Sequence, residues 1–309
     1  MSEISVVIPT MNRKDLLRVA LDSVASQTRP CMEAVVLDAG DDGSDELCRN
    51  YSFVRYFRQT TRGLTEARNE ALALVRGQYV GMLDSDDFYE PQFLELTAGA
   101  LDKGSDVAYA AGFRLTGDQR ADILHRHRTP QNVVSALVED NFVIASFTLQ
   151  RRCCFERLKG YRLGLKLADD YDLYLRMAIA GFQFVHVPVH LANRRHHEGS
   201  LTLSNPEGNI FALREILQHN ELAICALLQC EPEFLYAGIE CRLARHFFAS
   251  GNLERGLRHL SLARKGRPFD LRIFLWWALA NIPGGQAWLG LARVAKGALE
   301  RLRKAERRW

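Results

Sequence analysis

The stretch ISVVIPTMNRKDLLRVALDSVASQ, residues 4–27, predicts a buried strand that leads directly into a helix. Four of the five residues 4–8 are β-branched and apolar, which is typical of a strand covered on both faces. Pro9 and the polar residues after it end the strand, and residues 14–27 then place Leu, Ala and Val on one helix face. A strand followed at once by a helix is the first unit of an alternating α/β pattern.

The alternation continues along the next ninety residues or so. Further elements are predicted as strands at 34–37, 54–57, 79–83 and 107–113 and as helices at 64–75 and 91–101. Strands that alternate with helices favour a mostly parallel sheet flanked by helices. We therefore expect an α/β fold of the Rossmann-like class for this part of the chain.

Strand signals stop near residue 206, and the remaining pattern is helical. Helices are predicted at 211–228, 233–250, 253–263, 271–279 and 288–308. Gly251 and Asn252 form a plausible helix stop and turn. We expect two domains, an α/β domain at residues 1–205 and an all-helical C-terminal module at residues 206–309.

Composition excludes several classes of protein. The 309 residues are 47% hydrophobic and 25% charged, which excludes wholesale disorder. The net charge of +3 is too close to neutral to argue for a nucleic-acid partner, and we expect none. Seven scattered cysteines without a CxxC pair, and an N-terminus without a signal-peptide pattern, favour a reduced, cytoplasmic protein. The longest uncharged apolar run, 273–282, is too short to span a bilayer.

Polar side chains follow three of the predicted strands. They are Thr10 and Asn12, then Asp38, then Asp84, Asp86 and Asp87. In open α/β sheets ligands bind beyond the carboxyl ends of the strands, so these residues form the candidate site. A solvated loop is the plainer interpretation of any one cluster taken alone.

The segment Leu83-Asp84-Ser85-Asp86-Asp87 indicates a metal site. Carboxylates two residues apart, on a chain leaving a strand, can converge on one divalent cation. Hard oxygen ligands suit Mg²⁺ or Mn²⁺, and such ions also bridge phosphate oxygens. The alternative is an acidic turn or a helix N-cap before residues 88–96, and Asp87 fits the role of the cap best.

Further segments share a recognisable order with this one. They are VVIPTMNR (6–13), DSVASQT (22–28), RGLTEARN (62–69), LDSDD (83–87), DDYDLYLR (169–176) and RHHEGSLT (195–202). Together, over about residues 3–203, they resemble the inverting nucleotide-sugar glycosyltransferases of family 2, which have the GT-A fold. LDSDD corresponds to the DXD-type metal motif of that family.

The resemblance implies a role for each matching residue. Pro9, Thr10 and Asp38 would line the nucleobase and ribose side of the donor pocket, which Asn12 borders. Arg68 would contact the nucleotide, and Asp84 would lie near the ribose or the metal. Asp86 would be the principal metal ligand, His197 would approach the metal or the diphosphate, and Asp170 would be the general base.

The residues around Asp170 support a base at that position. Asp169 and Asp170 begin an amphipathic helix, and two adjacent carboxylates repel, which raises one pKa. An ordinary pair of helix N-terminal carboxylates is the alternative. Inversion requires a single base, because the acceptor hydroxyl attacks the anomeric carbon from the face opposite the leaving diphosphate.

Two positions depart from the family pattern. The family usually has two aspartates after the second strand, and the second commonly reads uracil, whereas this chain has Asp38-Ala39. Either Asp41 or Asp42 takes over, or base recognition differs, so a UDP-sugar is the first expectation and other nucleotides stay open. Asp169 stands where the family has Glu, which shortens one acceptor-side contact.

The expected function is sugar transfer from a nucleotide-diphospho-sugar to a saccharide or a lipid-linked saccharide, in bacterial cell-surface polysaccharide or glycan biosynthesis. One alternative is a sugar-nucleotidyltransferase, but residues 9–13 lack the glycines of its phosphate loop. Another is a non-catalytic scaffold with a degenerate transferase domain, which Ala39 favours. The intact Asp86 and Asp170 argue against that scaffold.

The C-terminal module concentrates basic charge. Residues 264–309 carry +8, and the rest of the chain carries −5. Tryptophans among Arg and Lys suit the headgroup region of an anionic leaflet, so we expect peripheral contact with the inner face of the cytoplasmic membrane. For Trp276 and Trp277 a helical core is an equally good interpretation.

Overall fold

The computed structural model describes residues 3–117, 119–123, 133–196 and 205–281. By contacts the chain divides between Ser204 and Asn205 into two compact units. Each unit is described by itself.

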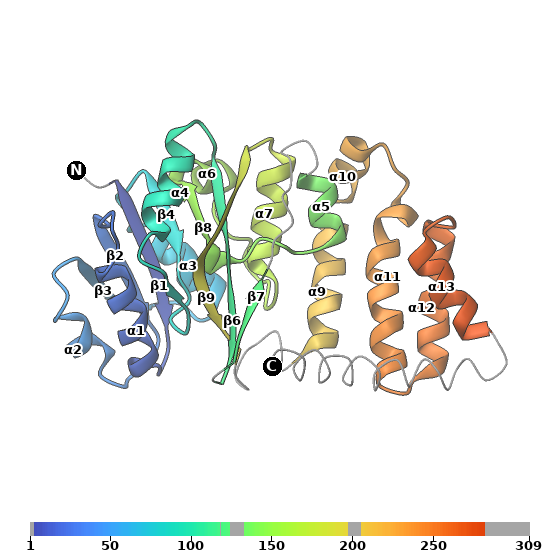
Figure 1. The fold of residues 1–309 in the computed structure, drawn as a ribbon, viewed down its shortest axis with the longest axis horizontal. Coiled ribbons are helices and arrows are strands. Elements are labelled where there is room, and N and C mark those ends of the chain that lie inside the picture. The colour runs from blue at the N-terminus through green and yellow to red at the C-terminus, as the bar shows by residue number, and fades with distance from the viewer. Residues whose placement is uncertain (1–2, 118, 124–132, 197–204, 282–309) are drawn as a thin grey trace, which may run out of the picture. The chain divides into compact units, whose positions relative to one another are not determined.

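The first half of the N-terminal unit follows the predicted alternation. Its elements are β1 (Ile4–Thr10), α1 (Lys14–Ala25), β2 (Glu33–Asp38), α2 (Ser44–Cys48), β3 (Val54–Arg58), α3 (Leu64–Leu72) and β4 (Tyr79–Met82). The strands are parallel and lie side by side in the order β3-β2-β1-β4 (Figure 1). The α/β pattern predicted for residues 4–83 is therefore confirmed.

The second half of this unit completes a mixed sheet. Its elements are β5 (Phe88–Tyr89), α4 (Phe93–Asp102), β6 (Val107–Thr116), β7 (Gln119–Ile123), α5 (Val133–Glu139), β8 (Thr148–Arg151), α6 (Arg152–Leu158), α7 (Asp169–Ile179) and β9 (Phe184–Arg195). The sheet order continues β4-β8-β6-β9-β5, with β7 paired to β6. β6 and β9 are parallel, whereas β5, β7 and β8 pair antiparallel with their neighbours. The longest ladders are parallel, as expected, and the three antiparallel strands were not predicted.

The register of the parallel strands positions the site. Thr10 pairs with Asp38 and Val7 with Met82, so β1, β2 and β4 end at the same edge of the sheet. The strands are held there by a hydrophobic core, in which the fully buried Ile8 of β1 and Leu17 of α1 belong to one cluster. Burying such side chains contributes about 1.5–3 kcal/mol each, which makes this edge a rigid platform.

The C-terminal unit is helical throughout its described part. It contains α9 (Pro206–His219), α10 (Glu221–Leu228), α11 (Pro232–Ala249), α12 (Leu253–Gly266) and α13 (Leu271–Asn281) (Figure 1). The single helix predicted at 211–228 is wrong, because the chain breaks at Asn220, whose side-chain amide donates back to the carbonyl of Ile216 at 2.7 Å.

The predicted turn between α11 and α12 is confirmed. Gly251 takes a φ of +81°, and the Asn252 side chain accepts a hydrogen bond from the Arg255 amide at 3.2 Å, which caps α12. A Cβ on Gly256 would lie 2.4 Å from the Phe248 ring, so only glycine lets the two helices approach this closely.

Trp276 and Trp277 both pack partly against the helical core. The Trp276 ring stacks on Phe248 with centroids 6.2 Å apart, and the Arg264 guanidinium lies 3.6 Å from the Trp277 ring centroid. These contacts favour the core interpretation of the two tryptophans. The helix predicted at 288–308 lies outside the described residues.

None of the described helices is long and apolar enough to cross a membrane by itself. Among the described helices, only α10 and α11 taken together are long and apolar enough by length and composition, and they are bent by 109° where they meet.

Candidate active site

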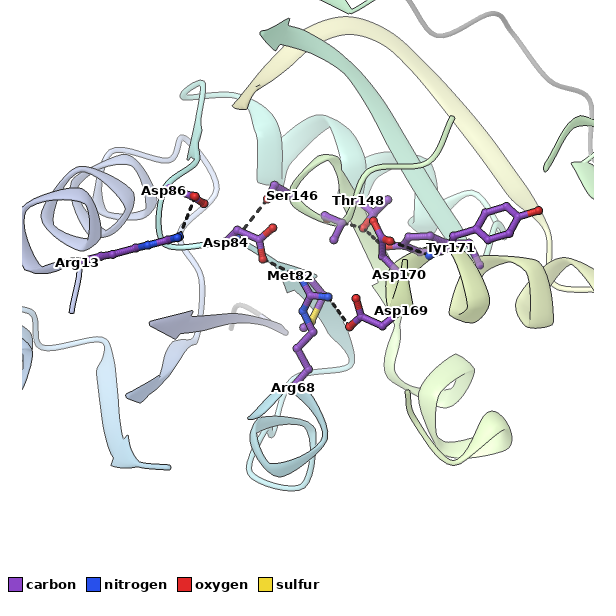
Figure 2. Close-up of polar contacts among 12 residues, drawn as sticks. Arg13, Arg68, Met82, Asp84, Asp86, Ser146, Thr148, Asp169, Asp170 and Tyr171 are labelled. Carbon is purple, nitrogen blue, oxygen red and sulfur yellow. Dashed lines mark hydrogen bonds and ion pairs between the residues drawn. The ribbon is translucent and has the colours of Figure 1, made fainter. Parts of the chain in front are cut away.

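Three carboxylates gather where the chain leaves β4. One carboxylate oxygen from each of Asp84, Asp86 and Asp87 lies within 4.8 Å of the other two. The Asp84 amide donates to the Ser146 hydroxyl at 3.1 Å, and the Asp87 amide donates to the Asp84 carbonyl at 2.9 Å, so the turn is held tightly (Figure 2). The convergence of Asp84 and Asp86 expected from their spacing is present.

Asp87 has a different place from the one predicted by the capping alternative. α4 begins only at Phe93, and the Asp87 carboxylate accepts a hydrogen bond from the Arg195 amide of β9 at 3.0 Å. The helix-cap interpretation is therefore wrong. Burial, together with the Asp84 and Asp86 charges, raises the pKa of Asp87 well above its usual range, which marks a concentration of negative charge.

Arginine side chains face two of these carboxylates. Arg13 Nη1 lies 2.8 Å from Asp86 Oδ2, and Arg195 Nη1 donates to the Asp86 backbone carbonyl at 3.0 Å. Arg68 Nη2 lies 2.7 Å from Asp84 Oδ1. The cluster is thus partly neutralised by the chain's own guanidinium groups.

Arg68 links the acidic cluster to the start of α7. Its side chain is only 3% exposed and also contacts Asp169 at 2.6 Å (Figure 2). Burial opposes the charge, but Asp169 and Asp84 outweigh it and raise the pKa of Arg68 well above its usual value. Its buried Nε has no hydrogen-bond partner among the described residues. The contact of Arg68 with a nucleotide stays a prediction.

Asp170 lies half-buried in the first turn of α7 and accepts a hydrogen bond from the Tyr171 amide at 2.8 Å. Burial is the main reason that its pKa is raised to about 6, and the neighbouring Asp169 charge adds to it, whereas Arg68 and Arg194 oppose the shift. The direction agrees with the repulsion argument, although burial contributes more than repulsion does.

A buried ion-pair network holds α7 in place, and the sequence patterns did not predict it. Asp172 is fully buried between Arg162 at 3.0 Å and Arg176 at 2.7 Å. The Tyr174 and Thr148 hydroxyls, 2.7 Å apart, tie the same helix to β8. The Asp172–Arg176 spacing of four residues was the available signal, but it is equally common on exposed helix faces.

The ends of β1 and β2 form a second polar region. Thr10 is buried, and its hydroxyl has no hydrogen-bond partner among the described residues. Asp38 is buried and accepts from the Gly40 amide at 2.7 Å and from the Tyr56 hydroxyl at 3.0 Å. Pro9 precedes Thr10 in β1, where it pairs with Leu37.

The loops after β1 and β2 are joined by hydrogen bonds. Asn12 adopts a φ of +51°, and its side chain accepts from the Asp41 amide at 2.8 Å. Asp42 accepts from the Lys14 amide at 2.7 Å and from the Ser44 hydroxyl at 2.6 Å, so it is committed to the starts of α1 and α2. Of the two residues considered as replacements at Ala39, the exposed Asp41 is therefore the better placed to face a ligand.

His197, expected near the metal or the diphosphate, lies outside the described residues. The other predicted site residues fall into connected groups. Asp84 and Asp86 share the acidic cluster, Arg68 joins Asp84 to the neighbour of Asp170, and Asn12 reaches the loop that follows Asp38.

Comparison with known proteins supports one assignment. A chondroitin synthase of Escherichia coli is 28% identical over 206 residues, covering 63% of this chain and 29% of the relative. Glycosyltransferase GlyA of Streptococcus pneumoniae is 38% identical over 98 residues, covering 30% of this chain and 14% of the relative. This chain thus spans less than a third of the length of either relative.

The fold matches a solved structure as well. The crystal structure of S. aureus TarS 1–349 in complex with UDP-GlcNAc has a TM-score of 0.66 at 19% identity, covering 95% of this chain and 88% of that one. At this identity the likeness speaks for the fold alone, and it confirms the expected GT-A architecture. The model of the family "Glycosyl transferase family 2" matches residues 5–159, about half of the chain, so the chain belongs to glycosyl transferase family 2.

Proposed function

We propose that this protein is an inverting glycosyltransferase that moves a sugar from a nucleotide-diphospho-sugar to an acceptor hydroxyl. The observation that carries the proposal is the Arg68 bridge, which places a cluster of three carboxylates next to the turn that holds Asp170. Transfer requires charge control at the leaving diphosphate and a base at the acceptor, and the bridge joins residues suited to each task.

The donor's nucleoside would lie at the ends of β1 and β2. The Thr10 hydroxyl is buried and has no hydrogen-bond partner among the described residues, and Asp41 is exposed in the loop that Asn12 holds. A uridine nucleotide is the first expectation, and the S. aureus TarS structure, in which the bound molecule is UDP-GlcNAc, supports it.

The chemistry of the acidic cluster fits a divalent cation. Three carboxylates within 4.8 Å are hard oxygen donors, and burial together with the charges of Asp84 and Asp86 raises the pKa of Asp87. A cation would relieve the part of this shift that comes from the neighbouring charges. Asp84 and Asp86 would hold Mg²⁺ or Mn²⁺, with His197 as the further ligand inferred from the family. The bound cation would supply positive charge beside the departing diphosphate.

Asp170 would act as the general base. Its carboxylate accepts the proton of the acceptor hydroxyl as that oxygen forms a bond to the anomeric carbon. The bond from the anomeric carbon to the diphosphate oxygen breaks on the opposite face, so the nucleoside diphosphate leaves with the electron pair. Asp169 is occupied by Arg68 and is the poorer candidate for this step.

The acceptor would be a saccharide or a lipid-linked saccharide used in bacterial surface-polysaccharide or glycan assembly. The similarity to a chondroitin synthase supports a saccharide acceptor. The basic segment 264–309 would bring the enzyme to the anionic inner face of the cytoplasmic membrane. Unchanged pelleting with anionic liposomes after removal of residues 293–309 would contradict this membrane role.

Calorimetric titration tests the proposal directly. The purified protein is titrated with UDP, GDP and TDP, each with and without Mn²⁺, and the best nucleotide is then tested as its sugar donor for release of the nucleoside diphosphate. We expect metal-dependent binding of one nucleotide. If the protein binds none of the three nucleotides, the transferase proposal is wrong and the non-catalytic scaffold replaces it.

A further inference from the structure

Arg13 forms an ion pair with Asp86, the carboxylate on which the metal assignment depends most. Its Nη1 lies 2.8 Å from Asp86 Oδ2 (Figure 2), and the two side chains are 35% and 15% exposed. Asp86 is the residue expected to be the principal metal ligand. The guanidinium therefore contacts an oxygen that a divalent cation would use.

The backbone of Arg13 is fixed, but its side chain is not enclosed. Arg13 follows Asn12, and its carbonyl accepts the first hydrogen bond of α1, from the Leu17 amide at 2.8 Å. Beyond the helix start, the long side chain reaches across to the acidic cluster and remains about one-third exposed. Such a side chain can change its rotamer without disturbing the core.

Arg68 provides the contrast. It is 3% exposed and contacts the carboxylates of Asp84 and Asp169 at 2.7 and 2.6 Å. Breaking these pairs would leave a buried charge without a partner, which is costly. Arg195 is also held, because its guanidinium donates to a backbone carbonyl and stacks over Phe88 at 4.9 Å. Among the three arginines described at the cluster, Arg13 is the one whose ion pair is open to exchange.

We propose that Arg13 is an exchangeable counter-ion of Asp86. Arg13 pairs with Asp86 when no cation is bound. Once Asp86 binds the cation, the Arg13 side chain moves to the diphosphate oxygens of the donor. The inference rests on the proposed function and adds a residue whose role the family resemblance leaves unassigned.

The physical reason lies in the balance of charge. A guanidinium and a divalent cation compete for one carboxylate and repel each other, whereas both attract a diphosphate. Arg13 should therefore weaken binding of the cation alone and strengthen binding of the nucleotide in the presence of the cation. Metal and donor then bind cooperatively, since each removes an obstacle to the other.

The test measures both affinities in an Arg13→Gln variant. Free Mn²⁺ is quantified by electron paramagnetic resonance without nucleotide, and UDP binding is followed by calorimetry at saturating Mn²⁺. We expect Mn²⁺ alone to bind about 2- to 5-fold more tightly than in the wild type, as loss of a partly exposed ion pair implies. We expect UDP to bind about 10-fold more weakly, as loss of a charge-assisted contact implies.

Two variants serve as controls. Arg29→Gln removes the same charge from a similar ion pair, with Asp102 at 3.0 Å, that includes none of the acidic-cluster residues, and it should change neither affinity. Arg13→Lys keeps the positive charge and should give values between those of the wild type and Arg13→Gln. It also allows the test to proceed if Arg13→Gln does not fold.

The outcomes separate this inference from the proposed function. If Mn²⁺ and UDP bind the wild type but Arg13→Gln leaves the affinity for Mn²⁺ alone unchanged or weakened, partner exchange is refuted and the transferase proposal stands. If Mn²⁺ binds the wild type neither alone nor with UDP, the metal assignment fails and the inference fails with it.

Discussion

The two sides of the candidate active site balance their charges in different ways. On the side of β4, Asp86 pairs with a partly exposed Arg13, and Asp84 is 37% exposed. On the side of α7, Asp172 is fully buried between two arginines, and Asp169 is 12% exposed against Arg68. On the β4 side the Arg13–Asp86 pair is open to exchange, which suits the arrival of a charged donor. The α7 side is locked, which suits a base that must be held at a fixed position.

The largest expected effect comes from removing the proposed base, Asp170, on the α7 side. Asp170→Asn should lower the rate of sugar transfer about 10²- to 10⁴-fold, because the amide cannot accept the acceptor's proton. Metal-dependent nucleotide binding should stay near the wild-type value, since the proposed donor site lies at β1, β2 and β4. Initial rates and calorimetry measure the two quantities, and full turnover by this variant would show that Asp170 is not the base.

Breaking the buried network should cost stability. Asp172→Ala removes the buried partner that Arg162 and Arg176 share, while Arg162 stays 33% exposed and Arg176 keeps its hydrogen bonds to backbone carbonyls, so the free energy of unfolding should fall by about 1.5–3 kcal/mol in urea titrations. Glu156→Ala, which removes an exposed partner of Arg152, is the matched control and should cost less than about 0.5 kcal/mol. An equal loss of unfolding free energy in Asp172→Ala and Glu156→Ala would show that the buried ion pairs stabilise the fold no more than exposed ones do.

Asp170 should itself reduce stability at neutral pH. Its pKa is raised to about 6 in the folded state, so folding disfavours its charged form. The cost is absent well below the usual Asp pKa of about 4, where the carboxyl is protonated in both states, and is fully present above the folded pKa. Allowing for its partial exposure, Asp170→Asn should be more stable than the wild type by about 1–2 kcal/mol at pH 7.5, and the gain should approach zero near about pH 3. A gain that does not vary with pH would contradict this explanation.

The smallest effect concerns the pH profile. Transfer should decline as the pH falls through about 6, because Asp170 becomes protonated and can no longer accept a proton. Arg194 lowers the pKa of Asp170, so Arg194→Gln should move the midpoint of the profile to higher pH. The logarithm of kcat/KM against pH measures it, and a shift to lower pH would refute the assigned sign.

How far the sequence could predict this fold depended on the length of each signal. The apolar run of β1 and the leucine spacing of α1 are long enough to be read without tertiary information. β5 has two residues and β8 has four, and strands this short carry too little periodicity to distinguish them from loops. The break at Asn220 was missed because the apolar spacing continues on both sides of it.

The candidate site shows the same division. Asp84 and Asp86 could be paired from their spacing, because residues this close on one turn must be neighbours. The Arg68 contact with Asp169 joins residues 101 positions apart, and no local pattern encodes it. The family resemblance suggested a nucleotide contact for Arg68, which stays a prediction, and the folded chain adds its contacts with two carboxylates.

By itself the sequence determined the α/β class, the family and the acidic turn after β4, because local periodicity and short motifs carry that information. The tertiary structure alone decided which carboxylates are buried, which of them pair with an arginine, and why the pKa of Asp170 is raised. Burial and ion pairing depend on residues that are distant in the chain and adjacent only after folding. For that reason the contrast between the exchangeable Arg13 and the locked Arg68 is visible only in the folded protein.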